Sequence, residues 1–366
     1  MAKHEDVSRE LRAEISSGLF GPGSRLPSEA QLVERFSVSR PTVARALRDL
    51  QGEGLIERRA GSGTFVCESS KTAQAAEVLG LLIPELGSTE IFQAIGGELG
   101  ALTRGRGFGL LWGGSASPYV DRDSSPQHAL EVCQQFVDKR VAGVFFAPLE
   151  YYEHKDKLNN ELLDRLRKSG IPVILLDRDA APFPHRSAFD LVSLDNFGAG
   201  YMLGEHLIRL GCKKIQFIAR PGSAATVDAR ISGVREAILR YGQAIGKDFT
   251  QFGDPEDVKF VRSLKPGRSC DAIVCANDLT AAKILKTLTA MDIAVPAEVS
   301  VVGFDDVRYA SLLTVPLTSI AQPCREIAQL AFRMMLDRIA DPRLPARTVS
   351  LAPRLVVRDS CGAYQR

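Results

Sequence analysis

The strongest constraint on the fold is a series of short apolar runs that alternate with helical patterns through most of the chain. Seven such runs occur, at residues 78–83, 108–112, 143–147, 173–176, 215–219, 272–276 and 300–304. Short strands separated by one helix each are typical of βαβ units, whose strands pair in parallel. Seven strands are more than one six-stranded sheet requires, so we expect an α/β region with two similar subdomains.

The first 68 residues have a different character and predict three short helices followed by a hairpin. The apolar residues recur at helical spacing: Val7, Leu11 and Ile15, then Leu32, Val33 and Phe36, then Val43, Leu47 and Leu50. Ser28 and Ser39 stand where N-caps are expected. Residues 55–58 and 64–66 read as two strands around Ala60-Gly-Ser-Gly63, which predicts a hairpin, or wing.

The polar residues of this module indicate a DNA-binding surface. With the apolar stripe of the third helix buried, Arg40, Thr42 and Arg45 face outward near its start, where a recognition helix meets the major groove. Serine hydroxyls at helix N-termini suit phosphates, and a glycine-tipped wing can enter a groove. The alternative is a small scaffold whose arginines are only solvated.

Residues 5–67 resemble the winged helix-turn-helix of the GntR family of bacterial regulators. The resemblance rests on four motifs: Leu26-Pro-Ser-Glu29, Val38-Ser-Arg-Pro-Thr-Val43, Ala46-Leu-Arg-Asp-Leu50 and Gly61-Ser-Gly-Thr-Phe-Val66. One departure is Ala30, which stands where the family often has a DNA-contacting arginine. The residues that we expect at the DNA are Ser28, Glu29, Ser39, Arg40, Thr42, Arg45, Arg59, Gly61, Ser62 and Gly63.

Polar residues follow several predicted strands of the α/β region, where ligands collect in open parallel sheets. They are Asp177-Arg178, Asn277-Asp278 and Asp305-Asp306, with Arg230 after a further strand and Phe92 at the start of a helix. Guanidinium, carboxylate and amide groups can bind neighbouring sugar hydroxyls, and an aromatic face can cover the apolar side of a sugar. For Asp278 and Asp306 an N-cap is the favoured role, and the two arginines have the alternative of structural ion pairs.

The region 78–360 resembles the effector domain of the LacI family, which shares the type I periplasmic sugar-binding fold. The motifs include Ile171-Pro-Val-Ile-Leu-Leu-Asp-Arg178, Val192-Ser-Leu-Asp-Asn196, Ala229-Arg-Ile-Ser-Gly233 and Val299-Ser-Val-Val-Gly-Phe-Asp-Asp306. The resemblance implies two Rossmann-like subdomains with parallel sheets, joined by crossovers near Asn196, Ile320 and Arg347. It points to ligand contacts at Phe92, Arg178, Arg230, Asn277, Asp305 and Gln322.

These observations give a domain plan. We expect a winged helix-turn-helix domain at 1–68, a linker at 69–77 and a LacI-type ligand-binding domain at 78–366. Subdomain 1 is expected at about 78–195 and 321–346, and subdomain 2 at about 196–320 and 347–360.

The motifs typical of the main enzyme classes of this fold type are missing. There is no Gly-x-Gly-x-x-Gly after a strand, no phosphate loop and no nucleophile elbow, and the seven cysteines form no Cys-x-x-Cys pair. No run approaches the ~18 apolar residues of a membrane helix. We therefore expect no catalysis, no cofactor, no metal and no membrane partner, and a cytoplasmic location.

The function expected from the sequence is a sugar-responsive transcriptional repressor. It would bind double-stranded operator DNA as a homodimer and be released by a small-molecule effector, a monosaccharide. A ligand-activated or dual regulator with a non-sugar effector is the alternative, and a sugar-modifying enzyme is a remote one.

Overall fold

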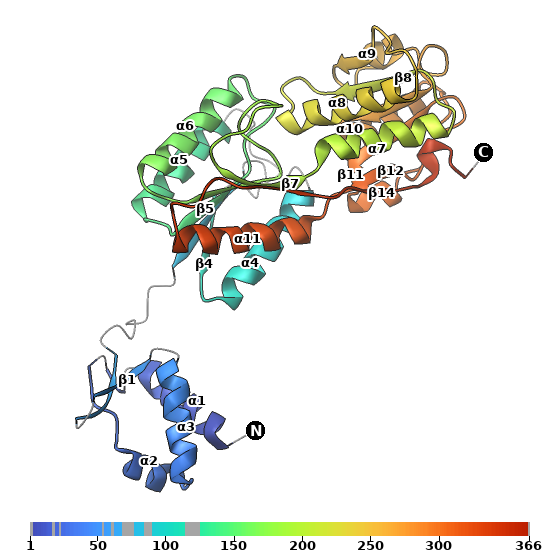
Figure 1. Ribbon diagram of the computed structural model, residues 1–366. Helices are drawn as coiled ribbons and strands as arrows, with labels where there is room; N and C mark the ends of the chain where they lie inside the picture. The colour runs from blue at the N-terminus through green and yellow to red at the C-terminus, as the bar shows by residue number, and fades with distance from the viewer. Residues whose placement is uncertain are drawn as a thin grey trace. The chain divides into compact units, whose positions relative to one another are not determined.

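The computed structural model describes residues 3–16, 19–21, 23–52, 55–59, 62–67, 77–83, 90–113 and 125–364. It divides into two compact units, Met1–Ala76 and Glu77–Arg366, each described here by itself (Figure 1). Of the predicted features, Gly61 and the linker up to residue 76 lie outside the described residues.

The N-terminal unit contains three helices and a two-stranded antiparallel sheet. Its elements are α1 (Lys3–Ser16), α2 (Glu29–Phe36), α3 (Arg40–Gly52), β1 (Ile56–Arg59) and β2 (Gly63–Val66). Ser28 caps α2 in a capping box, because its side chain accepts from the Gln31 backbone and the Gln31 side chain accepts from the Ser28 backbone. The predicted apolar stripes meet in the core, where Leu11, Leu32, Val43 and Leu50 are buried.

The C-terminal unit contains two six-stranded sheets. The first has the order β13-β7-β6-β5-β3-β4, and all its neighbouring strands are parallel. Its strands are β3 (Val78–Leu82), β4 (Gly109–Gly113), β5 (Gly143–Phe146), β6 (Val173–Leu176), β7 (Asp190–Leu194) and β13 (Thr348–Leu351). With the helices on its two faces, this sheet forms subdomain 1.

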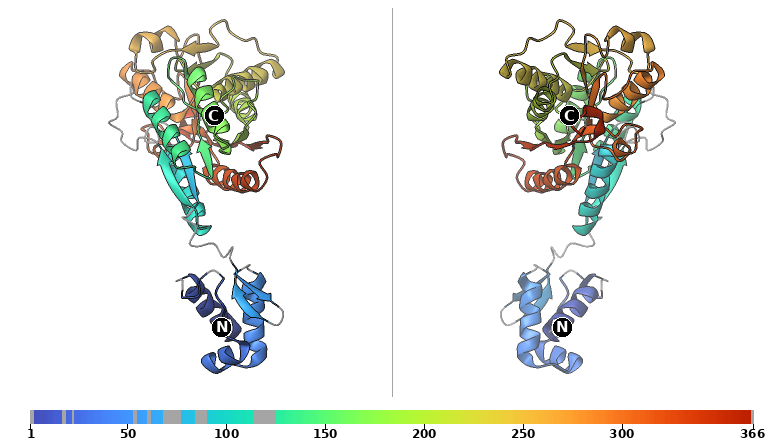
Figure 2. Two further views of the ribbon diagram at one scale, coloured as in Figure 1. Left: turned by 90° about the vertical axis from the view of Figure 1, so that its left-hand side faces the viewer. Right: turned by 90° about the vertical axis from the view of Figure 1, so that its right-hand side faces the viewer.

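Helices cover both faces of this sheet because its strands are apolar on both sides. α4 (Glu90–Gly105) and α11 (Cys324–Ala340) pack on one face, where they meet Phe145; α5 (Ser125–Asp138) and α6 (Lys155–Lys168) pack on the other, where they meet Phe146. The red helix α11 thus lies beside α4, far from it in sequence (Figures 1 and 2).

The second sheet has the order β14-β12-β11-β10-β8-β9, with only β14 antiparallel to its neighbour. Its strands are β8 (Ile215–Ala219), β9 (Thr250–Phe252), β10 (Ala272–Cys275), β11 (Ser300–Asp305), β12 (Thr318–Ala321) and β14 (Arg354–Val356). α7 (Asn196–Arg209) and α8 (Ala225–Arg240) cover one face, and α9 (Val258–Ser263) and α10 (Asp278–Ala290) cover the other. Together these elements form subdomain 2, with two short 3-10 helices, η3 (Arg308–Ser311) and η4 (Asp359–Cys361).

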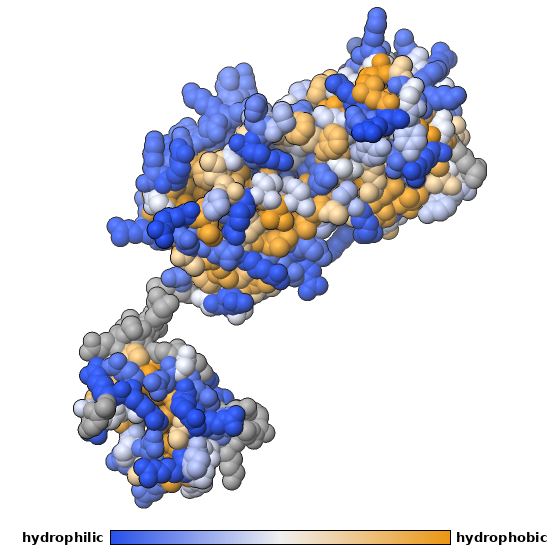
Figure 3. Space-filling view, in the orientation of Figure 1, coloured by the Kyte–Doolittle hydropathy of each residue, from blue (hydrophilic) through white to orange (hydrophobic). Residues whose placement is uncertain are grey.

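Figure 3 shows hydrophilic and apolar areas side by side on this face, and one of the apolar areas lies at the end of subdomain 2 that carries α9. Phe252 and Val258 are exposed on β9 and α9 at this end. Among the described residues, no helix is long and apolar enough to cross a membrane.

The chain passes between the subdomains three times. It crosses after β7, after β12 and between β13 and β14. The predicted position of the third crossover, near Arg347, was wrong: β13 still pairs with β7 in subdomain 1, from Thr348↔Leu191 to Leu351↔Leu194. The crossing therefore falls between Leu351 and Arg354, and the predicted fold class of a winged helix-turn-helix plus two parallel-sheet subdomains is confirmed.

α7 and α8 approach each other so closely that their facing positions have no room for a side chain. A Cβ atom at Gly200 would collide with the Arg230 carbonyl, and one at Gly233 would collide with the Phe197 carbonyl. A Cβ at Gly204 would come within 2.9 Å of the Ala237 Cβ. Glycine is required here because helix backbones touch, and this contact fixes where the N-termini of both helices lie.

Candidate nucleic-acid interface and ligand cleft

The outer face of α3 carries the residues predicted to read DNA. Val43 and Leu47 face the core with exposed fractions of 0% and 1%, whereas Arg40, at the first position of the helix, and Arg45 are exposed to solvent. The Ser39 hydroxyl lies 2.8 Å from the Thr42 hydroxyl at the start of the helix. Two arginines therefore stand beside a pair of hydroxyls at a helix N-terminus, an arrangement suited to bases and phosphates.

Glu29 ties the wing to the start of α3. Its carboxylate accepts a hydrogen bond from Arg58 at 2.9 Å and lies 3.6 Å from the Arg40 guanidinium. In this structure Glu29 therefore orients two arginines, and Ser28 is engaged in its capping box. Both predicted residues have positioning roles in the free protein, beside the residues predicted to contact DNA.

The wing is held by contacts around its tip. Arg59 pairs with Glu57 at 2.5 Å and lies 4.8 Å from the Phe65 ring centroid, while Ser62 is exposed. Gly63 has φ +115°, and a Cβ there would come within 2.8 Å of the Arg25 Nε. Arg25 is an exposed arginine beside the wing that the sequence analysis did not predict. Its position directly before the motif Leu26-Pro-Ser-Glu29 could have indicated it.

In the C-terminal unit, Arg178 stands at the centre of the predicted ligand cleft. It follows β6, is 7% exposed, and its guanidinium lies 5.1 Å from the Phe92 ring centroid. It forms an ion pair with Glu150, and within the described part of the chain its Nε has no hydrogen-bond partner. A buried donor without a partner is costly, so this nitrogen is available to a ligand.

Arg230 lies across the cleft on α8 and is 4% exposed. Its Nε donates to Asn196 Oδ1 at 2.7 Å, its Nη1 donates to the Ala276 carbonyl at 2.6 Å, and it stacks 4.3 Å from the Phe304 ring centroid. These contacts fix the guanidinium plane near the ends of β10 and β11.

Gln322 joins carboxylates from both subdomains. Its Nε2 lies 3.3 Å from Asp177 Oδ1 and 3.4 Å from Asp305 Oδ1, and its buried Oε1 has no partner among the residues that the structure describes. Burial raises the pKa of Asp305 to about 7, with the Arg230 guanidinium opposing the shift and Asp177 adding to it. Burial also raises the pKa of Asp177.

Asn277 is the N-cap of α10: its Oδ1 accepts from the Thr280 backbone at 2.8 Å, and its Nδ2 donates to the Tyr151 hydroxyl at 3.3 Å. The N-cap roles favoured for Asp278 and Asp306 were wrong. Asp278 is fully buried and accepts from Ser319 at 2.6 Å and from the Val307 backbone, whereas Asp306 pairs with Arg358 at 2.7 Å. Tertiary partners, and not helix N-termini, satisfy these two carboxylates.

Glu150 and Tyr151, after β5, are cleft residues that sequence reasoning missed. The Ala224 backbone donates to Glu150 Oε2 at 3.2 Å, and the Tyr151 backbone donates to the Gly222 carbonyl at 2.7 Å. The Arg220 guanidinium lies 4.4 Å from the Tyr151 ring centroid. The sequence could have indicated these two residues, because they follow the apolar run 143–147 just as Arg178 follows the run 173–176.

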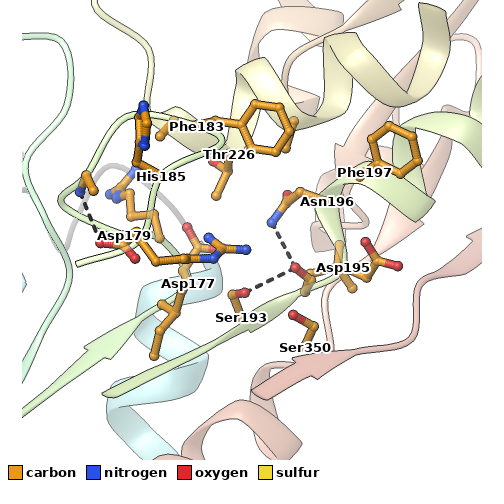
Figure 4. Close-up of a pocket in the computed structure, with 17 residues that line it drawn as sticks. Asp177, Asp179, Phe183, His185, Ser193, Asp195, Asn196, Phe197, Thr226 and Ser350 are labelled. Carbon is orange, nitrogen blue, oxygen red and sulfur yellow. Dashed lines mark hydrogen bonds between the residues drawn. The ribbon is translucent and has the colours of Figure 1, made fainter. Parts of the chain in front are cut away.

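A pocket of about 70 Å³ lies between the subdomains beside the first crossover (Figure 4). Arg178 is the one predicted ligand residue on its wall, where it is joined by Asp179, Ser193, Asp195 and Thr226. Phe92 lies against Arg178, Gln322 contacts Asp305, and Arg230 and Asn277 make separate contacts in subdomain 2 and with Tyr151. Among the described residues, no group of three or more His, Cys, Asp or Glu side chains is placed to hold a metal.

Two family profiles match the two units. Residues 3–66 match the bacterial regulatory proteins of the gntR family, and residues 205–361 match the periplasmic binding protein-like domain. The chain is a transcriptional regulator with a GntR-type head. The predicted family assignment is confirmed, and the relatives are DNA-binding regulators and not enzymes.

Individual relatives match this chain over different shares of its length. The chain is 25% identical over 371 residues to the arabinose metabolism transcriptional repressor of Geobacillus stearothermophilus, covering 98% of each chain. It is 31% identical over 227 residues to the repressor PurR of Proteus mirabilis, covering 61% of this chain and 64% of that one. Among solved structures, the regulator CelR in complex with cellobiose superposes with a TM-score of 0.66 at 24% identity, covering 88% of this chain and 91% of that one.

Proposed function

We propose that this GntR-headed regulator is a repressor that binds operator DNA as a homodimer in the cytoplasm and is released by a monosaccharide. The observation that carries the proposal is the cleft itself: arginine, carboxylate and amide side chains from facing strand ends converge beside an aromatic ring. These groups match the hydroxyls and apolar face of a sugar. A relative that spans nearly the whole chain is named for arabinose metabolism, which supports the sugar class.

The release mechanism follows from the way the cleft is built. Its ligand groups lie on both sides of the crossovers, with Arg178 and Phe92 in subdomain 1 and Arg230 and Asn277 in subdomain 2. A ligand that contacts both sides favours one relative orientation of the subdomains, and only this differential affinity can shift the equilibrium. In a dimer, that rotation would change the spacing of the two heads and lower the affinity for a palindromic operator.

Replacing Arg45 with alanine tests the head. We expect operator affinity to fall by about 10- to 100-fold, the value of one good arginine–guanine contact, with the sugar response unchanged. Fluorescence anisotropy with labelled operator at fixed salt measures it. Arg9→Ala on α1 removes the same charge from a side chain that is 60% exposed and should leave affinity within about twofold. If Arg45→Ala and wild type bound the operator with equal affinity, the prediction that α3 contacts DNA through Arg45 would be wrong.

Replacing Arg178 with alanine tests the cleft. We expect loss of the sugar-induced rise in melting temperature and of sugar-induced release from operator, because the guanidinium is fixed beside Phe92. A thermal-shift screen of pentoses and hexoses on wild type first identifies the sugar. Arg165→Ala on α6, whose arginine is 42% exposed and paired with Glu161, is the matched control. A retained shift in Arg178→Ala would place the ligand elsewhere.

A further inference from the structure

Acidic and basic side chains of the cleft lie close together. The carboxyl groups of Glu150, Asp177 and Asp305 lie near the guanidiniums of Arg178 and Arg230. Side-chain exposures of 8% for Arg178 and 14% for Glu150 show that their ion pair is shielded from water. A charge added here is weakly screened and must find an unpaired partner of opposite sign.

Glu150 is fixed in place from both subdomains. Its carboxylate pairs with Arg178 of subdomain 1 and accepts from the Ala224 backbone of subdomain 2 at 3.2 Å. The next residue is anchored as well, since the Tyr151 backbone donates to Gly222 and its hydroxyl accepts from Asn277. The carboxylate therefore cannot turn away from Arg178 without breaking contacts across the cleft.

We propose that Glu150 is a specificity-determining residue that restricts this cleft to uncharged ligands. By neutralising Arg178, it withholds a cation that a carboxylate or phosphate group of a ligand would otherwise pair with. Arg230 is already engaged by Asn196 and Ala276, and Arg220 lies against the Tyr151 ring. Sugar hydroxyls can still donate to Glu150, Asp177 and Asp305, and the Arg178 Nε remains free to donate to a sugar oxygen. The inference rests on the proposed function, because it names the class of sugar that the site accepts.

Replacing Glu150 with glutamine tests the proposal, because the amide keeps the shape and removes the charge. Isothermal titration with glucuronate and galacturonate, each beside its parent hexose, is run on wild type and on two variants. We expect wild type to bind neither uronate measurably and Glu150→Gln to bind at least one of them at least tenfold more tightly. Glu153→Gln is the matched control, since its side chain is 91% exposed, and it should behave like wild type.

Two results would overturn the proposal. One is uronate affinity in folded Glu150→Gln that is no greater than in wild type. The other is wild-type protein that binds a uronate more tightly than its parent hexose, which is decisive even if the variant does not fold. Failure of the proposed function is seen separately, as wild-type protein that no neutral sugar releases from its operator.

Discussion

Gly233→Ala is expected to destabilise the C-terminal unit by about 2–3 kcal/mol, and to do so by adding a single methyl group. The new Cβ would collide with the Phe197 carbonyl and lie 2.7 Å from the Tyr201 backbone nitrogen, so α7 and α8 must separate. Alanine's higher helix propensity offsets only about 1 kcal/mol of the strain. Denaturant unfolding of the purified protein, followed by the far-UV signal, measures the change.

Gly97→Ala is the control for this substitution. Gly97 also lies within a helix, α4, but a Cβ there meets no described atom within 4 Å. We expect this variant to be stabilised by roughly 0.5–1 kcal/mol, because alanine lowers the conformational entropy of the unfolded chain. If both variants shifted stability in the same direction, the close approach of α7 and α8 would be refuted.

Asp190→Ala should cost about 3–5 kcal/mol, the usual result of removing one partner of a buried ion pair. The Asp190 side chain is 0% exposed; it accepts from Arg338 at 2.9 Å and from the Arg347 backbone at 2.7 Å. Its loss leaves the Arg338 guanidinium, 13% exposed, without its carboxylate. Because Asp190 begins β7 and Arg347 precedes β13, the damage should centre on the edge of the first sheet.

The comparison for Asp190 is Asp337→Ala. Asp337 pairs with the same Arg347 at 2.8 Å but is 55% exposed, so water screens the interaction. We expect a loss below about 1 kcal/mol. Urea unfolding of both variants gives the two free energies of unfolding. Similar losses of stability for the two would show that the ion pairs of Asp190 with Arg338 and Arg347 contribute no more than an exposed pair.

The sequence predicted those elements whose pattern is local. The apolar runs at 78–83 and 272–276 became β3 and β10, since strands buried on both faces consist almost entirely of apolar residues. β9 and β14 escaped prediction because each has three residues, some of them exposed, at a sheet edge. The error at the third crossover had the same cause: β13 alternates exposed and half-buried residues, and only pairing with β7 defines it.

In the candidate site, too, residues with a local sequence pattern were predicted and contacts between distant segments were not. Arg178, Asn277 and Asp305 were predictable because each follows an apolar run, at the strand ends where ligands collect. The partners of these residues were not predictable, since the ion pair of Arg178 with Glu150 and the contact of Asn277 with Tyr151 join segments 28 and 126 residues apart. Distance along the chain, and not residue type, limited the prediction.

The triple connection between the two sheets governs how the C-terminal unit can move. A single crossover would let the two subdomains rotate relative to each other about many axes. Three crossovers restrict them to rotations that all three connecting segments can follow. The free energy of ligand binding in the cleft would therefore favour one relative rotation of the subdomains. Lengthening the short segment between Leu351 and Arg354 would loosen one crossover. The subdomains could then rotate in other directions, and ligand binding would no longer be coupled to release from DNA.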